Sequence, residues 1–222
     1  MSITVRDDVS TEVIQTWGSD ELIARGARVS NGRDDLTGLD PERLIRALLT
    51  EGHMVPVEHV GMTLCIEAPV FVTRQLLKHR MTSISEISGR YIELPNVFYM
   101  PKYGRPMVNA GTSMKPIMET GTIGNFTMAT HQHLLAYEAA SDAYKTMLDS
   151  GITKEVARDV LPFGVYSRMW LTANLHSWLN IIKLRVKTGH PQHEVKLVGL
   201  QAEAHLREAF PLAMKVADGT FA

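Results

Sequence analysis

One segment, residues 75–91, carries the densest run of polar and charged side chains in the sequence. A Lys-His-Arg run occupies positions 78–80, and Glu86, Ser88 and Arg90 then alternate with apolar or small residues. In an extended strand, residues two apart share a face, so we expect these three side chains to point the same way. An arginine and a hydroxyl on one face suit a phosphate, and a carboxylate beside them suits a sugar or base. The segment therefore indicates a nucleotide site, with a solvated polar loop as the alternative.

A second group of candidate residues precedes an apolar run. His53, Glu58 and His59 lie in the segment His-Met-Val-Pro-Val-Glu-His. Two histidines and a carboxylate could bind a metal, and a metal-dependent hydrolase is one alternative function, which stoichiometric zinc in the purified protein would support. The two histidines are six residues apart around a proline, however, and not at the i, i+4 spacing of a His-Glu-x-x-His site. We favour histidines that are hydrogen-bonded or that contact a ligand.

The single cysteine is the first nucleophile to consider. Cys65 lies inside the apolar, β-rich run of residues 60–68, where cysteine commonly acts as a small core residue. A reactive thiol needs exposure and a positively charged neighbour. The pattern therefore argues against a covalent thiol mechanism.

Further polar candidates come from the second half of the chain. Arg158 sits in a short predicted helix, where an arginine usually forms a surface ion pair of little energetic weight. Asn174, Asn180 and Arg185 lie on a later helix, either as a solvated face or with specific tasks. Asparagine is a middling helix former, so two on one helix favour such tasks.

Composition limits the possible functions. The 222 residues suit one domain, and 45% hydrophobic and 21% charged residues are ordinary for a globular chain. The formal net charge is −1, which excludes a global basic field, so anion recognition must be local. A nucleic-acid-binding module that uses residues 78–80 is an alternative that this charge and the 7% aromatic content disfavour.

The same totals bear on location. One cysteine excludes an internal disulfide and fits a reducing compartment. The N-terminus has no signal pattern, and no apolar run approaches the ~20 residues of a membrane span. We expect a cytoplasmic protein without membrane contact.

The elements that must position these residues follow from periodicity and caps. Ser19 and Asp40 are predicted helix N-caps, and Gly52 a helix end. Residues 94–130 contain several Pro and Gly residues and are expected to form a functional loop, an insertion or an interface arm. Predicted strands cover residues 2–5, 60–68 and 163–172, and predicted helices residues 20–29, 41–51, 69–79, 131–150, 153–161, 175–186 and 192–210. Helices outnumber strands without regular alternation, which indicates an α+β fold.

Ordered segments of this chain resemble the flavin-dependent thymidylate synthases, whose signature is Arg-His-Arg, seven residues and Ser. Here Lys78-His79-Arg80 precedes Ser88 by the same seven residues, and Arg90-Tyr91 follows. The resemblance continues in Ala-Arg-Val-Ser at 27–30, in residues 53–59, in Ala-Arg-Asp-Val-Leu-Pro at 157–162 and in residues 174–185. It leaves chiefly residues 94–130 uncovered.

The resemblance implies a reaction and a fold. Such enzymes are methyltransferases that convert dUMP to dTMP, with methylenetetrahydrofolate as carbon donor and NADPH as reductant through bound FAD. They lack a cysteine nucleophile, and they are homotetramers whose active site is shared between subunits. The expected fold is a single domain over residues 1–222, with a mixed or antiparallel sheet flanked by helices and a helical C-terminal half.

The resemblance also assigns roles to residues. Ser88 and Arg90 would hold the dUMP phosphate, and Arg185 would polarise the pyrimidine as charge develops in the ring. Ser88 has no evident histidine–acid pair to activate it, so it is expected to position the phosphate and not to attack. The remaining nucleotide contacts would be Gln75, Glu86, Gly89 and Arg158. The contacts to FAD or its folate-facing side would be His53, Val55, Glu58, Lys78, His79, Arg80, Asn174, His176 and Asn180.

Three positions differ from the family pattern. Lys78 replaces the first arginine of the signature, which keeps the charge but loses the planar fork. Val55 stands where the family usually has Ser or Thr, and His176 where Arg is common. All three departures fall on the flavin-facing group and bear on flavin affinity more than on the reaction.

Overall fold

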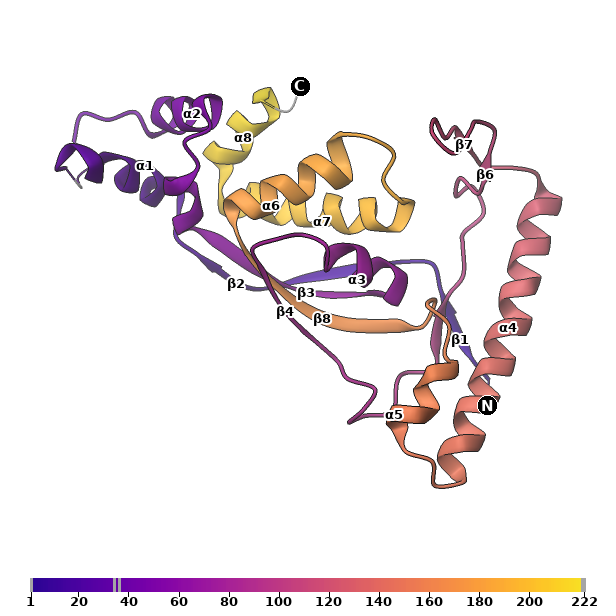
Figure 1. Ribbon diagram of the computed structural model, residues 1–222. Helices are drawn as coiled ribbons and strands as arrows, with labels where there is room; N and C mark the ends of the chain where they lie inside the picture. Colours follow the sequence, from indigo (N-terminus) through magenta and orange to yellow (C-terminus); the bar gives the residue numbers. More distant parts are fainter. Residues whose placement is uncertain (1, 34, 36, 221–222) are drawn as a thin grey trace. The chain divides into compact units, whose positions relative to one another are not determined.

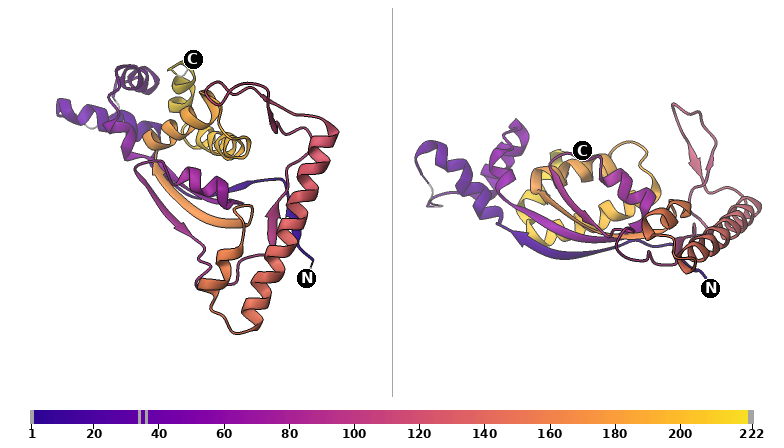
Figure 2. Two further views of the ribbon diagram at one scale, coloured as in Figure 1. Left: turned by 45° about the vertical axis from the view of Figure 1, so that its right-hand side comes forward. Right: turned by 60° about the horizontal axis from the view of Figure 1, so that its bottom comes forward.

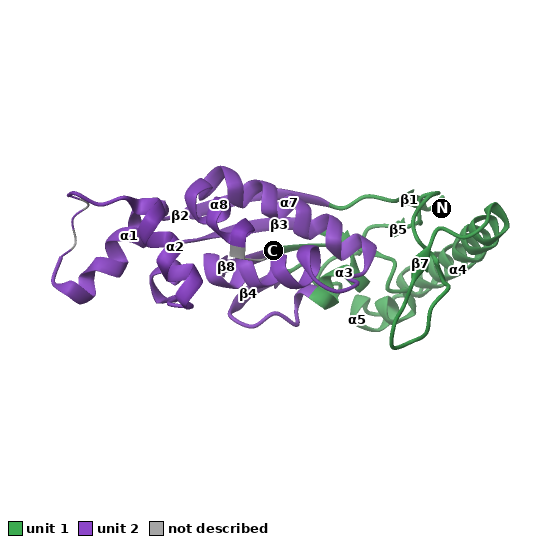
Figure 3. Cartoon of the chain, turned by 90° about the horizontal axis from the view of Figure 1, so that it is seen from above, with its two compact units in different colours: residues 1–9, 67–75, 86–169 green, residues 10–66, 76–85, 170–222 purple. Residues whose placement is uncertain are grey.

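The computed structural model describes residues 2–33, 35 and 37–220, and its chain divides into two compact units. The first unit comprises residues 1–9, 67–75 and 86–169, and the second comprises residues 10–66, 76–85 and 170–222 (Figure 3). Two of the five boundaries, at 66/67 and 169/170, fall inside strands β3 (Gly61–Pro69) and β8 (Tyr166–Asn174). Helices accompany both parallel and antiparallel strand pairs, which confirms the predicted α+β class.

The first unit is built around the 27-residue helix α4 (Ile123–Asp149), which Figures 1 and 2 show as one continuous rod. Thr122 begins it with a reciprocal capping box to Asn125. Strand β1 (Thr4–Arg6) pairs in parallel with β5 (Val97–Tyr99). Short elements complete the unit: α3 (Val70–Leu76), the antiparallel pair β6 (Val108–Asn109) and β7 (Met118–Glu119), α5 (Lys154–Ala157) and the 3-10 turn η3 (Arg158–Val160).

The core of the first unit lies where α4 meets β5. The ring of Phe98 stacks on that of Tyr137 with centroids 4.7 Å apart, and Val165 packs beside them. A Cβ on Gly164 would lie 2.3 Å from the Tyr137 hydroxyl oxygen, so only glycine fits there. Burial raises the pKa of Tyr137 to about 12. This core fixes Val165, the residue directly before β8.

Helices dominate the second unit. A four-stranded sheet has the order β2-β3-β8-β4, in which β2 is Ser10–Trp17 and β4 is Thr82–Glu86. Trp178 on α6 (Leu175–Ile182) is fully buried and donates from Nε1 to the Met62 carbonyl of β3 at 3.0 Å. The other helical elements are α1 (Asp20–Arg28), η1 (Val29–Asn31), α2 (Pro41–Glu51), η2 (Val55–His59), the π-helical turn η4 (Lys183–Lys187), α7 (His193–Ala209) and α8 (Pro211–Thr220).

Local capping predictions are confirmed in the second unit. The Ser19 side chain accepts from the Leu22 N–H, and the Asp40 carboxylate accepts from the N–H groups of Glu42 and Arg43. Gly52 ends α2 with φ of 72°, a left-handed conformation that favours glycine. These caps depend on neighbouring residues alone, which is why the sequence predicts them.

Several sequence-based expectations about elements are wrong. The helix predicted over residues 69–79 ends at Leu76, so residues 78 and 79 lie outside it. Strand β4 ends at Glu86, so Ser88 and Arg90 lie in a turn and not on an extended face. Helix α4 starts at 123, inside the region expected to be irregular, and α8 follows the helix expected to be last.

The helices of the described ranges include none that combines the length and apolarity of a bilayer-crossing segment.

Candidate functional site

A cavity of about 450 Å³ in the first unit is lined by Glu86, Gly89 and Arg158 of the predicted nucleotide group. The lining also includes Arg74 and Ser167. The Ser167 hydroxyl donates to Glu86 Oε1 at 2.5 Å, which fixes that carboxylate at the end of β4. The cavity thus presents two guanidinium groups, a fixed carboxylate and backbone at a glycine turn. Such a set suits an anionic ligand with a polar ring or sugar.

Ser88 and Arg90 belong to the turn that contains Gly89. The Ser88 Oγ accepts from the Arg90 N–H at 3.3 Å, and the Ser88 carbonyl accepts from the Tyr91 N–H at 3.0 Å. The Arg90 guanidinium is exposed and pairs with Glu155, with Nε 3.0 Å from Oε1. An exposed pair of this kind contributes little to stability, so the Arg90 side chain can exchange Glu155 for an anionic ligand at low cost.

Gly89 permits a close approach by Arg158. The glycine is buried, and a Cβ there would lie 3.0 Å from both Arg158 Cδ and Leu94 Cδ1. The Arg158 side chain therefore packs directly over the turn. Gln75, the remaining member of the group in this unit, is half-buried near the end of α3.

Sequence reasoning missed two contributors to this cavity. The Arg74 guanidinium lies over the Phe163 ring, 5.6 Å from its centroid, and both residues line the cavity. Ser167 is buried on β8 and bonds to Glu86 across 81 residues of sequence. Arg74 directly precedes the predicted Gln75, which was a usable signal. Nothing in the local sequence marks Ser167.

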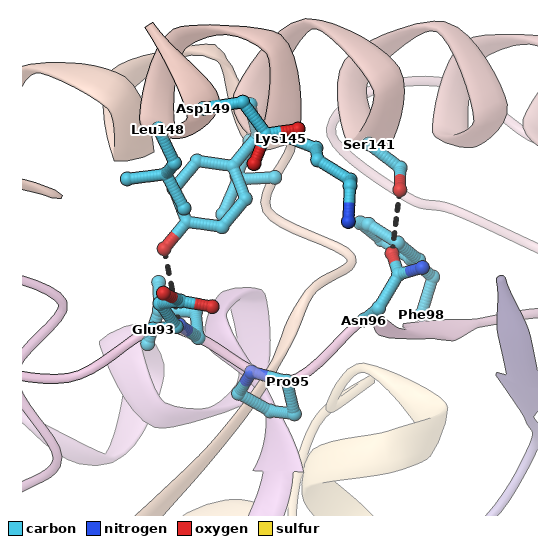
Figure 4. Close-up of a pocket in the computed structure, with 11 residues that line it drawn as sticks. Glu93, Pro95, Asn96, Phe98, Ser141, Lys145, Leu148 and Asp149 are labelled. Carbon is cyan, nitrogen blue, oxygen red and sulfur yellow. Dashed lines mark hydrogen bonds between the residues drawn. The ribbon is translucent and has the colours of Figure 1, made fainter. Parts of the chain in front are cut away.

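A smaller cavity of about 140 Å³ lies along α4 of the first unit (Figure 4). The Ser141 hydroxyl donates to Asn96 Oδ1 at 2.8 Å there, and the Leu94 N–H donates to the Tyr144 hydroxyl at 3.2 Å. No predicted site residue lines this cavity, so it does not contribute to the candidate site.

The predicted flavin group falls entirely in the second unit. Within it, Glu58 Oε1 lies 2.8 Å from His176 Nδ1, although the two residues are 118 positions apart. Glu58 comes from η2 and His176 from the first turn of α6, and these elements pack together. The contact orients the imidazole and fixes which ring nitrogen faces away from the carboxylate.

Asn174 and Asn180 have separate tasks. Asn174 caps α6, since its side chain accepts from the Ser177 N–H at 2.9 Å. Asn180 is exposed, and with His176 and Lys183 it lines a cavity of about 180 Å³ that also contains apolar side chains. His176 and Asn180 are four apart on α6, so they share one face.

Other members of the flavin group lie at the surface. Val55 is 69% exposed, and Lys78 and Arg80 are also exposed. His53 is exposed, with Nδ1 3.4 Å from Glu51 Oε2. These side chains are available to a ligand, but they do not line the 180 Å³ cavity.

Arg185 contacts the flavin group although it was predicted to serve the nucleotide. It lies in the second unit, on the π-helical turn η4, and its Nε donates to His79 Nε2 at 3.1 Å. Burial, followed by the Arg185 charge, lowers the pKa of His79 below its ordinary value of 6.5. His79 therefore accepts as a neutral imidazole, with its proton on Nδ1.

Two alternative chemistries, a cysteine nucleophile and a metal site, can be compared with the geometry. Cys65 is 4% exposed on β3, as predicted for a core residue. Within the part of the chain that the structure describes, His, Cys, Asp and Glu side chains form no group of at least three that could hold a metal. His53, Glu58 and His59 therefore do not converge as a metal site would require.

Comparisons with known proteins point to one family. The family model described as thymidylate synthase complementing protein matches residues 12–212. Proteins named flavin-dependent thymidylate synthase from Streptomyces avermitilis and Streptomyces coelicolor are 37% and 36% identical, and the alignments cover 93% and 95% of this chain and 89% and 91% of theirs.

Solved structures also match this chain. The UMP/dUMP methylase PolB from Streptomyces cacaoi, bound with 5-Br dUMP, superposes with a TM-score of 0.92 at 32% identity. The alignment covers 98% of this chain and 97% of that one. The same methylase bound with 5-Br UMP gives a TM-score of 0.91 at 30% identity, covering 98% and 96%.

Proposed function

Because this chain belongs to the flavin-dependent thymidylate synthase family, we propose that it methylates dUMP to dTMP with FAD as its flavin. Methylenetetrahydrofolate is the proposed carbon donor and NADPH the proposed reductant. The protein is accordingly a methyltransferase. The family match extends over residues 12–212, which supports one catalytic domain across the chain.

The observation that carries the proposal is the cavity of the first unit. Its volume of about 450 Å³ lies within the roughly 300–1,000 Å³ of small-molecule sites. In the proposed complex, Ser88 and Arg90 bind the dUMP phosphate, and Gln75, Glu86, Gly89 and Arg158 surround the rest of the nucleotide. A solved relative carries a brominated dUMP, which supports a pyrimidine nucleotide as the ligand.

Arg185 is the proposed electrostatic catalyst. Its guanidinium would polarise the pyrimidine and stabilise the negative charge that develops in the ring. The hydrogen bond that Arg185 donates to His79 engages only Nε, so the terminal nitrogens of the guanidinium stay available for that contact. Ser88 is proposed to position the phosphate.

The second unit offers a chemically suitable set for FAD. Lys78 and Arg80 supply positive charge for a pyrophosphate, and His176 and Asn180 supply hydrogen-bonding groups at the edge of a partly apolar cavity. His53, Val55, Glu58, His79 and Asn174 complete the proposed flavin group. When bound, FAD would supply the redox chemistry, and these side chains would bind and orient it.

We propose a homotetramer with a shared active site. The 180 Å³ cavity of the flavin group is smaller than a complete cofactor site, which supports further contacts from another subunit. Helix α4 also exposes large apolar side chains, including Ile123 at 68%, Met128 at 59% and Leu135 at 50%. Exposed apolar surface of this kind commonly marks a protein interface.

The proposed mechanism uses no cysteine nucleophile, which the burial of Cys65 supports. We also propose a cytoplasmic location, because a lone cysteine fits a reducing compartment.

The experiment is direct. The purified protein should be yellow, and its reduced flavin should be reoxidised on addition of dUMP and methylenetetrahydrofolate, with dTMP formed. Parallel assays with UMP in place of dUMP, and with NADH in place of NADPH, define both specificities. A colourless protein that takes up no added FAD would overturn the proposal.

A further inference from the structure

The backbone that carries Arg185 is unusual. Residues 183–187 form a π-helical turn, closed by the Thr188 N–H donating to the Lys183 carbonyl at 3.0 Å. The Thr188 hydroxyl donates to the same carbonyl at 2.8 Å. In such a turn the hydrogen bonds join residues i and i+5, one residue further apart than in an α-helix. These turns are rare and often occur at functional sites. A π-turn changes the direction in which the following side chains project, so whatever holds it also sets the direction of Arg185.

Helix α7 meets this turn at a glycine. A Cβ on Gly199 would lie 2.7 Å from Val186 Cγ2 and 3.7 Å from Arg185 Cβ. Val186 is β-branched and stiff at χ1, so it cannot rotate away freely. The φ of Gly199 is not in the left-handed region, so the constraint at this position is space and not backbone conformation. The glycine therefore allows the turn to pack directly on α7.

A buried carboxylate holds the other end of the turn. Glu203 is 6% exposed and lies four residues after Gly199, so both share one face of α7. Its Oε1 accepts from Lys187 Nζ at 2.8 Å and from Arg207 Nη2 at 2.5 Å. Arg207 also pairs with Asp218 of α8 at 2.7 Å, which anchors the network in the C-terminal helix. A buried carboxylate with two cationic partners is satisfied and strongly held.

We propose that Gly199 and Glu203 are positioning residues for Arg185, which they hold in place by fixing the π-helical turn on α7. Gly199 sets how closely the turn approaches, and Glu203 fixes its end through Lys187. The consequence for catalysis rests on the proposed function, in which Arg185 contacts the pyrimidine. The placement of Arg185 does not rest on that function, because the pKa of its neighbour His79 measures the placement without any catalytic assay.

The first test uses His79 as that reporter. NMR titration of histidine-labelled protein, with flavin content matched by absorbance and His79 assigned from the His79→Gln spectrum, measures its pKa. Gly199→Ala should shift Arg185 away, raise the pKa of His79 toward its ordinary value, and lower kcat/KM for dUMP roughly tenfold or more. Adding Val186→Ala removes the clashing methyl groups and should restore both quantities.

The controls separate positioning from general stability. Gly219→Ala, in α8 with nothing within 4 Å of the new Cβ, should change neither quantity. Lys187→Met should raise the pKa of His79 and lower kcat/KM for dUMP, as Gly199→Ala does. Lys187→Arg should leave both quantities at their wild-type values. Asp218→Asn weakens the Arg207 pair and the longer 3.9 Å ion pair with Lys187, but it leaves the 2.8 Å Lys187–Glu203 hydrogen bond. It should therefore lower thermal stability without moving the His79 pKa.

Two results would count against the proposal. A Gly199→Ala protein with the wild-type His79 pKa and kcat/KM would overturn it, as would a Gly199→Ala defect that Val186→Ala leaves unchanged. A wild-type protein that forms no dTMP would instead overturn the proposed function, and the His79 titration would still decide the placement of Arg185.

Discussion

Arg185 donates a hydrogen bond to His79 at 3.1 Å, although the two residues lie 106 positions apart. The sequence divided them between a nucleotide group and a flavin group, and the structure joins them in one pair. Because the bond requires a neutral His79, the position of the guanidinium depends on the protonation of the imidazole. A residue proposed for catalysis is thereby coupled to a titratable neighbour.

Stability should therefore depend on pH through His79. Its folded pKa is lowered below 6.5, so between the folded value and 6.5 the unfolded chain binds a proton that the folded chain does not. The free energy of unfolding should rise with pH through that window and level off above it. Urea unfolding at about pH 5 to 7 should show a steeper rise in the wild type than in His79→Gln. Equal pH slopes in the two proteins would contradict the prediction.

Arg90 and its partner Glu155 make a matched pair of variants. Arg90→Ala removes a charge-assisted contact of about 1.5–3 kcal/mol, so the Kd for dUMP should rise about 10- to 100-fold while FAD content is unchanged. Glu155→Gln releases Arg90 from its competing partner and should leave dUMP binding equal or tighter. Isothermal titration with dUMP and flavin absorbance measure the two effects. Loss of flavin with dUMP binding retained would mean that the two groups are assigned in reverse.

Gly89→Ala tests the close approach of Arg158. The new Cβ would crowd Arg158 Cδ and Leu94 Cδ1, each at 3.0 Å, so the arginine must shift by a few tenths of an ångström from its place in the cavity. The Kd for dUMP should rise several-fold. Arg158→Ala should then raise the Kd by a smaller factor in the Gly89→Ala protein than in the wild type, because the two changes act on one contact. Gly124→Ala on α4, whose new Cβ has ordinary 3.5 Å contact with Thr122, is the control and should bind dUMP normally. Fully additive effects of the two variants would contradict the mechanism.

Asp20 should matter for stability through its contact with α8. Its buried carboxylate accepts from the Leu212 and Ala213 N–H groups at 2.8 Å and 3.0 Å, and so caps α8 from the start of α1. Asp20→Ala leaves two buried donors without this acceptor and should lower the free energy of unfolding by about 1–3 kcal/mol. Asp20→Asn keeps one acceptor oxygen and should cost less. Urea denaturation measures both, and an unchanged midpoint for Asp20→Ala would refute the capping role.

The sequence by itself determined the features that depend on near neighbours. The caps at Ser19 and Asp40, the end of α2 at Gly52 and the buried strand around Cys65 follow from local hydrogen bonding and from the spacing of apolar residues. The ordered family segments pointed to the family, because residue types at fixed spacing along the chain do not depend on the folded coordinates.

Only the tertiary structure decided which distant side chains meet. It pairs Glu58 with His176, Ser167 with Glu86 and Arg185 with His79, over separations of 118, 81 and 106 residues. It also ends α3 at Leu76 and β4 at Glu86, earlier than the sequence pattern indicated. Local propensity is weak against packing, and long-range pairs are set by how helices and strands pack, which no short window of sequence contains.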